Sequence, residues 1–304
     1  MIIVPNYYHK FKCIADKCQH NCCIGWEIDI DEETMAKYNS LSGKLAKKIR
    51  ANIEGDVPHF VLGKDERCPF LNEDGLCDII AEYGEEMLCE ICSLHPRFRN
   101  FYSDFAEMGL GLCCEEAARI ILLEREKFAI IVPEDIQKDV EEAEFFQIRE
   151  HIFGIVQDRE KSIKERFCAL AELFDLKFEF SLEKLRALYL SLERLDDKWT
   201  KEIEKLAGYF FDIDIFCDES MQIPFEQLCC YFVFRHISEA MWDGDYAGRV
   251  NFALMSCYFI GALFSYYKDK DGDLEVARMI DIVRMYSSEV EYSEENMEKI
   301  IKKY

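Results

Sequence analysis

Residues 11–29 read FKCIADKCQHNCCIGWEID and contain four cysteines within eleven positions, Cys13, Cys18, Cys22 and Cys23. Six more follow in close groups: Cys68 with Cys77, Cys89 with Cys92, and Cys113 with Cys114. Ten of the fifteen cysteines therefore fall in the first 114 of 304 residues. Closely spaced thiolates on turns are the usual ligands of Zn²⁺ and of iron–sulfur clusters. The pattern predicts a metal centre in this part of the chain.

A disulfide framework is the alternative interpretation of so many cysteines. It requires an oxidising compartment, yet Met1–Lys12 lacks the charged start, apolar core and cleavage site of a signal peptide. The number of cysteines is odd, and a chain of 304 residues can bury an ordinary core without covalent links. We therefore expect a cytoplasmic protein with reduced cysteines.

The charge balance restricts the classes of partner. Sixty acidic residues against 37 basic ones give a net charge of −23, and the acids are spread over both halves of the chain. Such a surface repels phosphate backbones, so we expect no nucleic-acid partner. A basic or lysine-bearing protein partner is compatible with it, although an acidic surface can also serve solubility alone.

Cysteine density and periodicity predict a mainly α fold with two regions. We expect an irregular cysteine-rich, metal-binding region over residues 1–128, packed on a helical region over residues 129–304. Apolar spacing, capping residues and turn residues predict the following helices: 33–38 behind Asp31 or Glu32, 42–53, 115–128, 135–158, 162–174, 181–195, 198–211, 224–242, 246–267, 274–286 and 293–304.

One predicted helix is apolar enough to suggest a membrane span. Val250–Tyr267 runs for eighteen residues without a formal charge, which is the lower limit for crossing a bilayer. It contains several polar side chains, however, and Arg249 and Lys268 bound it closely. We therefore expect a buried central helix and no membrane, with Cys229, Cys230 and Cys257 as core residues.

The number of ligands follows from side-chain geometry. Neighbouring side chains diverge, so each cysteine doublet is expected to give one ligand to a given metal atom. One ligand from each doublet and all the isolated cysteines give eight thiolates, enough for two four-cysteine sites or for one cluster with spare thiols. His20 can replace a thiolate at one position. Zinc and iron–sulfur remain open at this point.

Four sequence blocks in this order resemble the flagellin lysine-N-methylase family. The first is residues 11–29, and the second is CPFL at 68–71 with GLC at 75–77. The third is CSLHPR at 92–97, and the fourth is GLCCEEAAR at 111–119. The helical second half is similar only loosely, through residues 286–301. His95 stands where the family usually has tyrosine, and Glu115 where it tends to have proline.

The resemblance implies which residues bind metal and what the protein does. By this resemblance, the family's metal-ligating cysteines correspond to Cys13, Cys18, Cys22, Cys23, Cys68, Cys77, Cys92 and Cys114. Cys89 and Cys113 remain as extra thiols. It implies an iron–sulfur cluster, of the [4Fe–4S] type, with zinc as the alternative. It also implies an S-adenosylmethionine-dependent protein-lysine methyltransferase that acts on flagellin.

The residues that bind the methyl donor are less well indicated. Arg97 and Arg119 flank the thiols and can pair with a cofactor carboxylate or stabilise an anionic cluster. Acidic and aromatic side chains suit cations, which makes Trp26, Glu27, Asp29 and Tyr83 candidates. The glycines at 109 and 111 are expected to form a local turn, since no apolar strand is evident before them. No catalytic residue is identified.

Two other functions remain compatible with the sequence. One is a non-enzymatic protein that binds or handles zinc or iron, because the cysteines require no catalytic residue to explain them. The other is a redox or structural scaffold in which Zn²⁺ only stabilises the fold.

Overall fold

The computed structural model describes residues 1–131 and 140–303, and these residues pack as two compact units. The smaller unit is Lys12–Arg97, and the larger one combines Met1–Phe11 with the chain from Phe98 onward. The division predicted at residue 128 followed cysteine density, whereas these two units follow packing.

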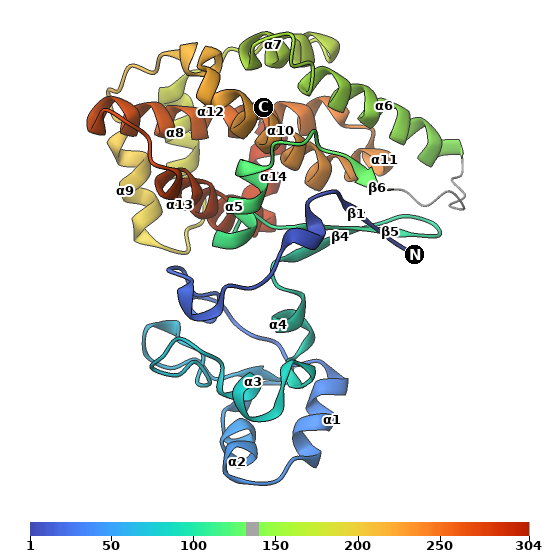
Figure 1. Cartoon of the computed structure of the whole chain (residues 1–304), viewed down its shortest axis with the longest axis vertical. Coiled ribbons are helices and arrows are strands. Elements are labelled where there is room, and N and C mark those ends of the chain that lie inside the picture. Colours follow the sequence, from blue (N-terminus) through green and yellow to red (C-terminus); the bar gives the residue numbers. More distant parts are fainter. Residues whose placement is uncertain (132–139, 304) are drawn as a thin grey trace. The chain divides into compact units, whose positions relative to one another are not determined.

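The smaller unit consists of short helices and one hairpin joined by turns (Figure 1). Its helices are α1 (Glu32–Ser40), α2 (Lys44–Ala51), α3 (Asp78–Tyr83) and α4 (Glu90–Leu94), with single 3₁₀ turns at Ala15–Lys17, Lys64–Glu66 and Glu85–Met87. The hairpin pairs β2 (Ile53–Glu54) with β3 (His59–Phe60).

Asp31 links the first and last helices of this unit. Its carboxylate caps α1 by accepting a hydrogen bond from the amide of Thr34 at 2.9 Å, and it also accepts one from the amide of Glu90 at 2.8 Å. An aromatic core lies beneath, where the rings of Phe60 and Phe70 meet edge to face with centroids 4.8 Å apart. The buried thiols of Cys68 and Cys89 belong to the same core.

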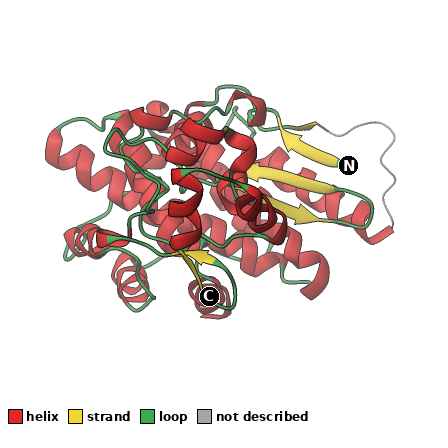
Figure 2. Cartoon of the chain, turned by 90° about the horizontal axis from the view of Figure 1, so that it is seen from below, coloured by secondary structure: helices red, strands yellow, loops and turns green. Residues whose placement is uncertain are grey.

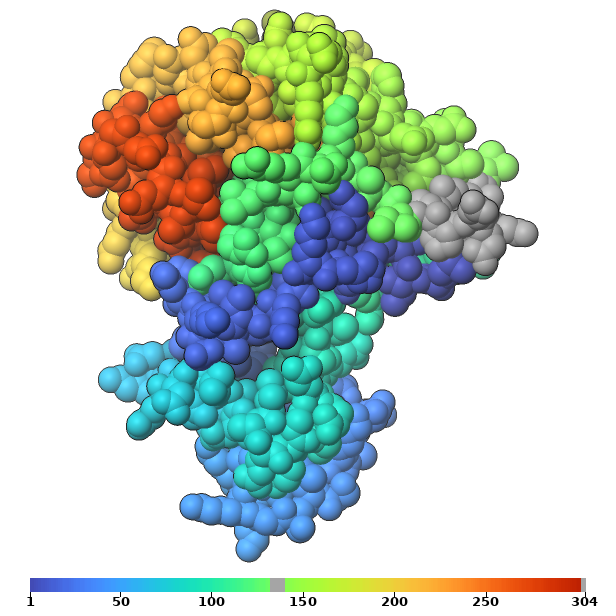
Figure 3. Space-filling model, in the orientation of Figure 1, coloured from blue at the N-terminus to red at the C-terminus, as the bar shows by residue number. Residues whose placement is uncertain are grey.

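The larger unit contains a four-stranded sheet in the order β4-β5-β1-β6 (Figure 2). The strands are β1 (Ile2–Pro5), β4 (Arg97–Phe101), β5 (Ala106–Leu110) and β6 (Ile130–Ile131). β1 runs parallel to β5 and antiparallel to β6, which ties the N-terminus to residues 98–131. In the space-filling view, dark blue N-terminal residues lie directly against green residues of that stretch (Figure 3).

Helices form the rest of this unit. They are α5 (Glu115–Leu123), α6 (Val140–Val156), α7 (Ile163–Leu173), α8 (Leu182–Leu190), α9 (Asp197–Lys205), α10 (Gln222–His236), α11 (Ala240–Asp243), α12 (Tyr246–Asp271), α13 (Val276–Tyr286) and α14 (Glu294–Lys303). Short turns of 3₁₀-helix occupy Tyr8–Lys10, Ile213–Cys217, Glu219–Met221 and Ile237–Glu239, and Ser287–Glu291 forms a π-helix.

The helices α10 and α12 pack together at the centre of the core. α12 is long and apolar enough to cross a membrane, and it is the one helix of the described residues that meets this test. Within its most apolar stretch, 89% of the residues are buried inside the protein. The expected burial of this helix and of Cys229, Cys230 and Cys257 is therefore confirmed.

The predicted helix starts agree with the structure better than the ends. Ser162 and Ser181 cap α7 and α8, and Ser162 forms a full capping box with Glu165. Gly244 and Gly272 end α11 and α12 with φ of 73° and 81°, values that favour glycine. The helices predicted to end at 128 and 211 stop at Leu123 and Lys205. Positions 135–139 and 304 of two predicted helices lie outside the described residues.

The mainly α fold is confirmed, but the sheet was not predicted. β5 contains Glu107, which is fully buried in the strand and breaks the expected alternation of apolar side chains. Its carboxylate is paired with Arg149 of α6 at 2.5 Å and accepts a hydrogen bond from Tyr102 at 2.9 Å. The strand therefore depends on a partner more than forty residues away, which no local pattern indicates.

Candidate metal centre

The first cysteine doublet is held by a short ladder against the segment that contains Cys68. The amide of Cys68 donates to the carbonyl of Cys23 at 2.9 Å, and the amide of Gly25 donates to the carbonyl of Glu66 at 3.1 Å. Asn21 fixes the doublet from the other side. Its Oδ1 accepts from the amide of Cys23 at 2.9 Å, and its Nδ2 donates to the carbonyl of Gly75 at 3.3 Å.

A compact loop brings Cys77 back toward Cys68. Leu71 and Cys77 pair as an antiparallel bridge, and the amide of Asp78 donates to the carbonyl of Phe70 at 2.8 Å. Within the turn, the Asn72 side chain accepts hydrogen bonds from the amides of Asp74 and Leu76 at 3.1 and 3.0 Å. The CPFL and GLC blocks are therefore the two sides of one loop.

Three cysteines occupy the starts of short helices. Cys77 and Cys89 are the N-cap residues of α3 and α4, and Cys92 lies in the first turn of α4. Burial raises the pKa of Cys77, against the backbone amides of Ile79 and Ile80 that act to lower it, and the hydrogen bond with Cys92 lowers the pKa of Cys89. Helix starts favour thiolates because their amides are not used inside the helix.

Six thiols of the smaller unit form one interacting group, which we call the six-thiol group: Cys22, Cys23, Cys68, Cys77, Cys89 and Cys92. Cys22 is hydrogen-bonded to Cys23, and Cys89 to Cys92. Cys23 also interacts electrostatically with Cys68 and Cys77, and Cys92 with Cys23 and Cys68. No disulfide joins the cysteines of residues 1–131 and 140–303.

Sharing a proton splits the pKa values within each hydrogen-bonded pair. The hydrogen bond from Cys23 lowers the pKa of the Cys22 thiol to about 7, while the same bond and burial raise the pKa of Cys23. The bond with Cys92 likewise lowers the pKa of Cys89, and that of Cys92 is raised. Burial raises the pKa of Cys68 to about 11. Each pair can therefore supply one thiolate readily, as a metal ligand must.

The spacing of the sulfurs bears on the kind of metal. A tetrahedral zinc ion with Zn–S bonds of about 2.3 Å holds its sulfurs only about 3.8 Å apart. Among the residues that the structure describes, no three cysteine sulfurs lie within 4.8 Å of one another. A cluster of several iron atoms binds one thiolate at each iron and spreads its ligands more widely. The soft donor set suits either metal.

The structure brings together five of the eight predicted ligands, Cys22, Cys23, Cys68, Cys77 and Cys92. The structure also places Cys89 in this group. The family resemblance left this residue as an extra thiol, but its C-x2-C spacing with Cys92 could have indicated its role as a ligand. Cys13 is exposed, and the Cys18 thiol donates to the carbonyl of His20 at 3.3 Å. The eighth predicted ligand, Cys114, lies in the larger unit, at the N-cap of α5.

The two candidate arginines have protein partners. Arg119 forms a two-bond ion pair with Glu116 of the same helix, with both nitrogen–oxygen distances 2.7 Å. Arg97 donates to the carbonyls of Ser93 and His95 at 3.5 Å. Their role toward a cofactor stays a prediction.

The glycine pattern at 107–111 has a packing role. Gly109 lies inside β5, where an added Cβ would come within 2.3 Å of the Phe98 ring and 2.8 Å of the Phe234 ring. Glycine is therefore needed for close packing of the strand. The local turn expected here comes after the strand, at residues 111–114.

Next to Cys113, the larger unit contains a second polar group. The guanidinium of Arg235 lies over the rings of Phe98 and Tyr292, 4.9 and 4.5 Å from their centroids, and burial raises the pKa of the Cys113 thiol to about 12. Glu291, at the end of the π-helix, accepts hydrogen bonds from His236 at 2.7 Å and from Tyr231 at 3.1 Å. Arg235 already occupies this aromatic cage, so the cage offers no place for a second cation.

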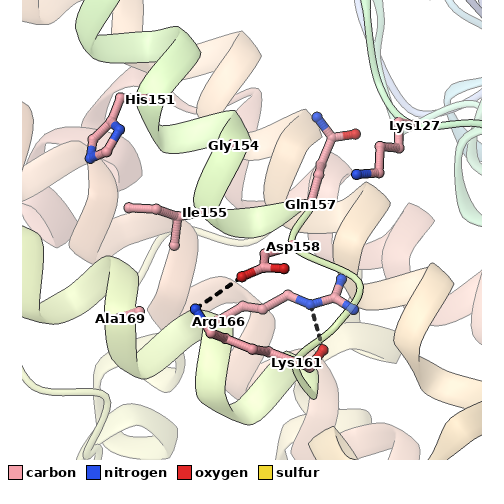
Figure 4. Close-up of a pocket in the computed structure, with 9 residues that line it drawn as sticks. All are labelled: Lys127, His151, Gly154, Ile155, Gln157, Asp158, Lys161, Arg166 and Ala169. Atoms are coloured by element: carbon pink, nitrogen blue, oxygen red, sulfur yellow. Dashed lines mark hydrogen bonds and ion pairs between the residues drawn. The ribbon is translucent and has the colours of Figure 1, made fainter.

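A pocket of about 330 Å³ lies between α6 and α7 (Figure 4). Its lining is mostly polar. Lys161 is paired with Asp158 at 2.9 Å, and Arg166 with Glu226 at 2.7 Å, so these two cations are already neutralised. Ligand pockets are usually lined by apolar and aromatic side chains, and we assign no cofactor to this one.

Comparisons with known proteins relate the chain to bacterial lysine-N-methylases. It is 26% identical to the lysine-N-methylase of Salmonella typhimurium over 165 residues, and 27% identical to that of Salmonella choleraesuis over the same length. It is 28% identical over 137 residues to the flagellar biosynthetic protein FliU of Salmonella muenchen, covering 79% of that protein. No family model and no solved structure matches the chain.

The alignments cover 50% of this chain and 40% of each lysine-N-methylase. The protein is thus a mainly α, cysteine-rich chain with a grouped set of thiols. Over about half of its length it is similar to the lysine-N-methylases, in agreement with the resemblance of its cysteine blocks.

Proposed function

We propose that this protein is a protein-lysine N-methyltransferase that transfers methyl groups from S-adenosylmethionine to lysine side chains of flagellin. The observation that carries the proposal is the six-thiol group, in which every cysteine except Cys89 comes from the blocks that resemble the methylase family. The relatives named lysine-N-methylase and FliU support the same reaction class and a flagellar substrate.

The six-thiol group is proposed to hold an iron–sulfur cluster of the [4Fe–4S] type. Four of its six cysteines suffice for one cluster, and the resemblance to the methylase family favours a cluster over a single zinc ion. When bound, such a cluster supplies either a redox centre or a cross-link that stabilises the smaller unit. The protein's part is to present reduced thiols from three separate segments of the chain.

The proposed transfer is a substitution at the methyl carbon. The lysine nitrogen forms a new N–C bond while the C–S bond of the methylsulfonium breaks, and S-adenosylhomocysteine leaves. The ammonium product then loses a proton to a base or to solvent. The reaction requires a neutral lysine aligned with the methyl group, and both reactants start as cations. A protein with a net charge of −23 favours the approach of two such cations.

The decisive experiment uses the full chain purified without oxygen. Its absorption spectrum, with iron and sulfide analysis, tests the cluster. Incubation with labelled S-adenosylmethionine and flagellin, followed by mass spectrometry, tests the transfer. We expect methylated lysines in flagellin and none on DNA. A Cys22→Ser variant should lose the cluster, while Cys217→Ser, which changes an exposed cysteine of the larger unit, should keep it.

The alternative is a metal-binding protein without catalytic activity. It is favoured by the grouping of the thiols, which explains metal binding without any catalytic residue. Cluster-loaded protein that neither binds S-adenosylmethionine by calorimetry nor modifies flagellin would replace the methylase proposal with this one. A colourless protein that retains zinc would instead reject the cluster.

A further inference from the structure

A histidine and two carboxylates meet on one face of the smaller unit, outside the six-thiol group. Asp29 pairs with His59 as an antiparallel bridge, and His59 pairs with Glu54 across the β2–β3 hairpin. Directly paired residues of neighbouring strands point to the same face. Asp29, His59 and Glu54 therefore form a row across three adjacent chain segments.

Glu27 joins the row because of strand alternation. Ile28 and Ile30 are buried in the core of this unit, with exposed fractions of 1% and 4%. Residues two apart in an extended chain share a face, so Glu27 and Asp29 both point away from that core. Two carboxylates are thus presented beside the His59 ring.

The donor atoms lie close to one another. One oxygen each of Glu27 and Asp29 and one nitrogen of His59 all lie within 4.8 Å of one another. The Nε2 atom of His59 is 3.7 Å from Oε2 of Glu27 and 3.9 Å from Oε1 of Glu54. Ligands of one cation with bonds of about 2.0 to 2.2 Å stand about 3 to 3.5 Å apart. A small rotation of the exposed Glu27 side chain would bring its carboxylate to this ligand–ligand distance.

The histidine is oriented for binding by a contact outside this group. Its Nδ1 atom lies 2.9 Å from the carbonyl of Val57. A carbonyl can only accept, so Nδ1 carries the hydrogen and the lone pair of the neutral ring is on Nε2, facing the carboxylates. Metal-binding histidines typically donate their second nitrogen to a backbone carbonyl in this way.

The hairpin turn holds the ring in place. Gly55 has φ of +88°, and a Cβ added there would lie 2.6 Å from Cε1 of His59. Glycine therefore lets the backbone close against the imidazole. The side chain of His59 is 21% exposed, against 65% for Glu27 and for Glu54. The His59 ring is therefore the most buried member of the group, and the more exposed carboxylates are accessible to water and to ions.

We propose that Glu27, Asp29 and His59 form a divalent cation site that is separate from the six-thiol group. One imidazole and two carboxylates suit Mn²⁺, Fe²⁺ or Zn²⁺ with water at the remaining positions. The donors are harder than thiolates, so Mn²⁺ is the cation that best distinguishes this site from the cysteines. The proposal does not depend on the methylase activity.

The test is a titration of the full chain with Mn²⁺. The amount of unbound ion at each step is measured from its electron paramagnetic resonance signal. We expect one ion bound per chain, with a nitrogen coupling from imidazole in the bound state. His59→Gln should abolish that coupling, and Glu27→Gln, at an exposed position, should weaken binding by about tenfold or more without affecting folding.

Two control variants make the result specific. Glu33→Gln removes an exposed carboxylate of α1, and Cys22→Ser disrupts the six-thiol group; both should bind Mn²⁺ like the parent protein. Absence of saturable binding in the parent protein would overturn the proposal. So would binding by both His59→Gln and Glu27→Gln that equals that of the parent.

Discussion

The backbone amide of Cys68 donates a hydrogen bond to the carbonyl of Cys23 at 2.9 Å, across forty-five residues of sequence. This bond places the first cysteine doublet beside the loop that carries Cys68 and Cys77. Cys89 and Cys92 join them from the start of α4. The group therefore depends on backbone pairing between segments as much as on cysteine spacing within each.

Replacement of Cys89 should reduce metal binding, although the family resemblance left this residue as an extra thiol. Cys89 is 1% exposed and shares a hydrogen bond with Cys92. We expect Cys89→Ser to lose at least about half of the bound iron, because the C-x2-C pair would keep a single thiolate. Iron and sulfide analysis after anaerobic purification measures the loss. Equal iron in Cys89→Ser and Cys217→Ser would contradict this role.

Asn21 should be as important to the centre as a ligand, although it binds no metal. Its side chain accepts from the amide of Cys23 and donates to the carbonyl of Gly75, so it fixes two cysteine loops at once. We expect Asn21→Ala to lower the stability of the smaller unit by about 1 to 3 kcal/mol, since two hydrogen bonds are removed. Faster loss of iron to a chelator would report the effect.

Asn21→Asp provides the matched comparison. It keeps the oxygen that accepts from Cys23 and replaces the donor to Gly75 with a carboxylate oxygen. Its iron loss should therefore fall between those of the parent protein and Asn21→Ala. An Asn21→Ala variant that releases iron at the parent rate would show that the turn is held by its backbone alone.

The sequence predicted the helical part of the molecule well because its signals are local. Ser162 and Ser181 cap the helices expected to start there, and α12 begins at Tyr246 as predicted. The sheet escaped prediction because β1 and β6 are short and β5 contains a buried glutamate. Such strands are fixed by partners distant in sequence, as Glu107 is by Arg149.

The candidate centre was predicted only in part, because contacts between distant segments also determine which cysteines come together. Cysteine spacing identified the blocks, but only the fold shows that Cys89 lies with Cys68 and Cys77. The row of Asp29, His59 and Glu54 has no spacing signature, because its members come from three separate segments, two of them the strands of the hairpin. Glu27 and Asp29 were candidates only for their charge.

The buried Glu107–Arg149 pair should be a major determinant of stability in the larger unit. The side chains are 0% and 2% exposed, and Arg149 lies over the Phe146 ring at 4.7 Å. Glu107→Gln would leave a buried guanidinium without its counter-charge, which costs about 3 to 5 kcal/mol. Urea denaturation followed by circular dichroism measures the difference.

The ion pair between Glu116 and Arg119 is the control for this prediction. The Arg119 side chain is 49% exposed, so water reaches its guanidinium, although the Glu116 side chain is only 10% exposed. Glu116→Gln should change stability by less than about 1 kcal/mol. Similar losses in the two variants would mean that burial does not distinguish these pairs.

His95 should make the stability of the smaller unit depend on pH. Burial lowers the pKa of His95 from 6.5 to about 4, and the charge of Arg97 acts in the same direction. The ring packs against Trp26, with centroids 5.6 Å apart. Between these pH values the unfolded chain binds more protons than the folded one, so the stabilising contribution is complete above pH 6.5 and is lost as the pH falls toward 4.

Replacing His95 with tyrosine, the residue that the family resemblance places there, removes this titration. We expect the parent protein to lose stability toward urea steadily as the pH falls through that window, and His95→Tyr to lose less. An NMR titration of the His95 ring should give a midpoint well below 6.5. Parallel pH profiles for the two proteins, or an ordinary midpoint for His95, would show that the ring is solvated in the folded state.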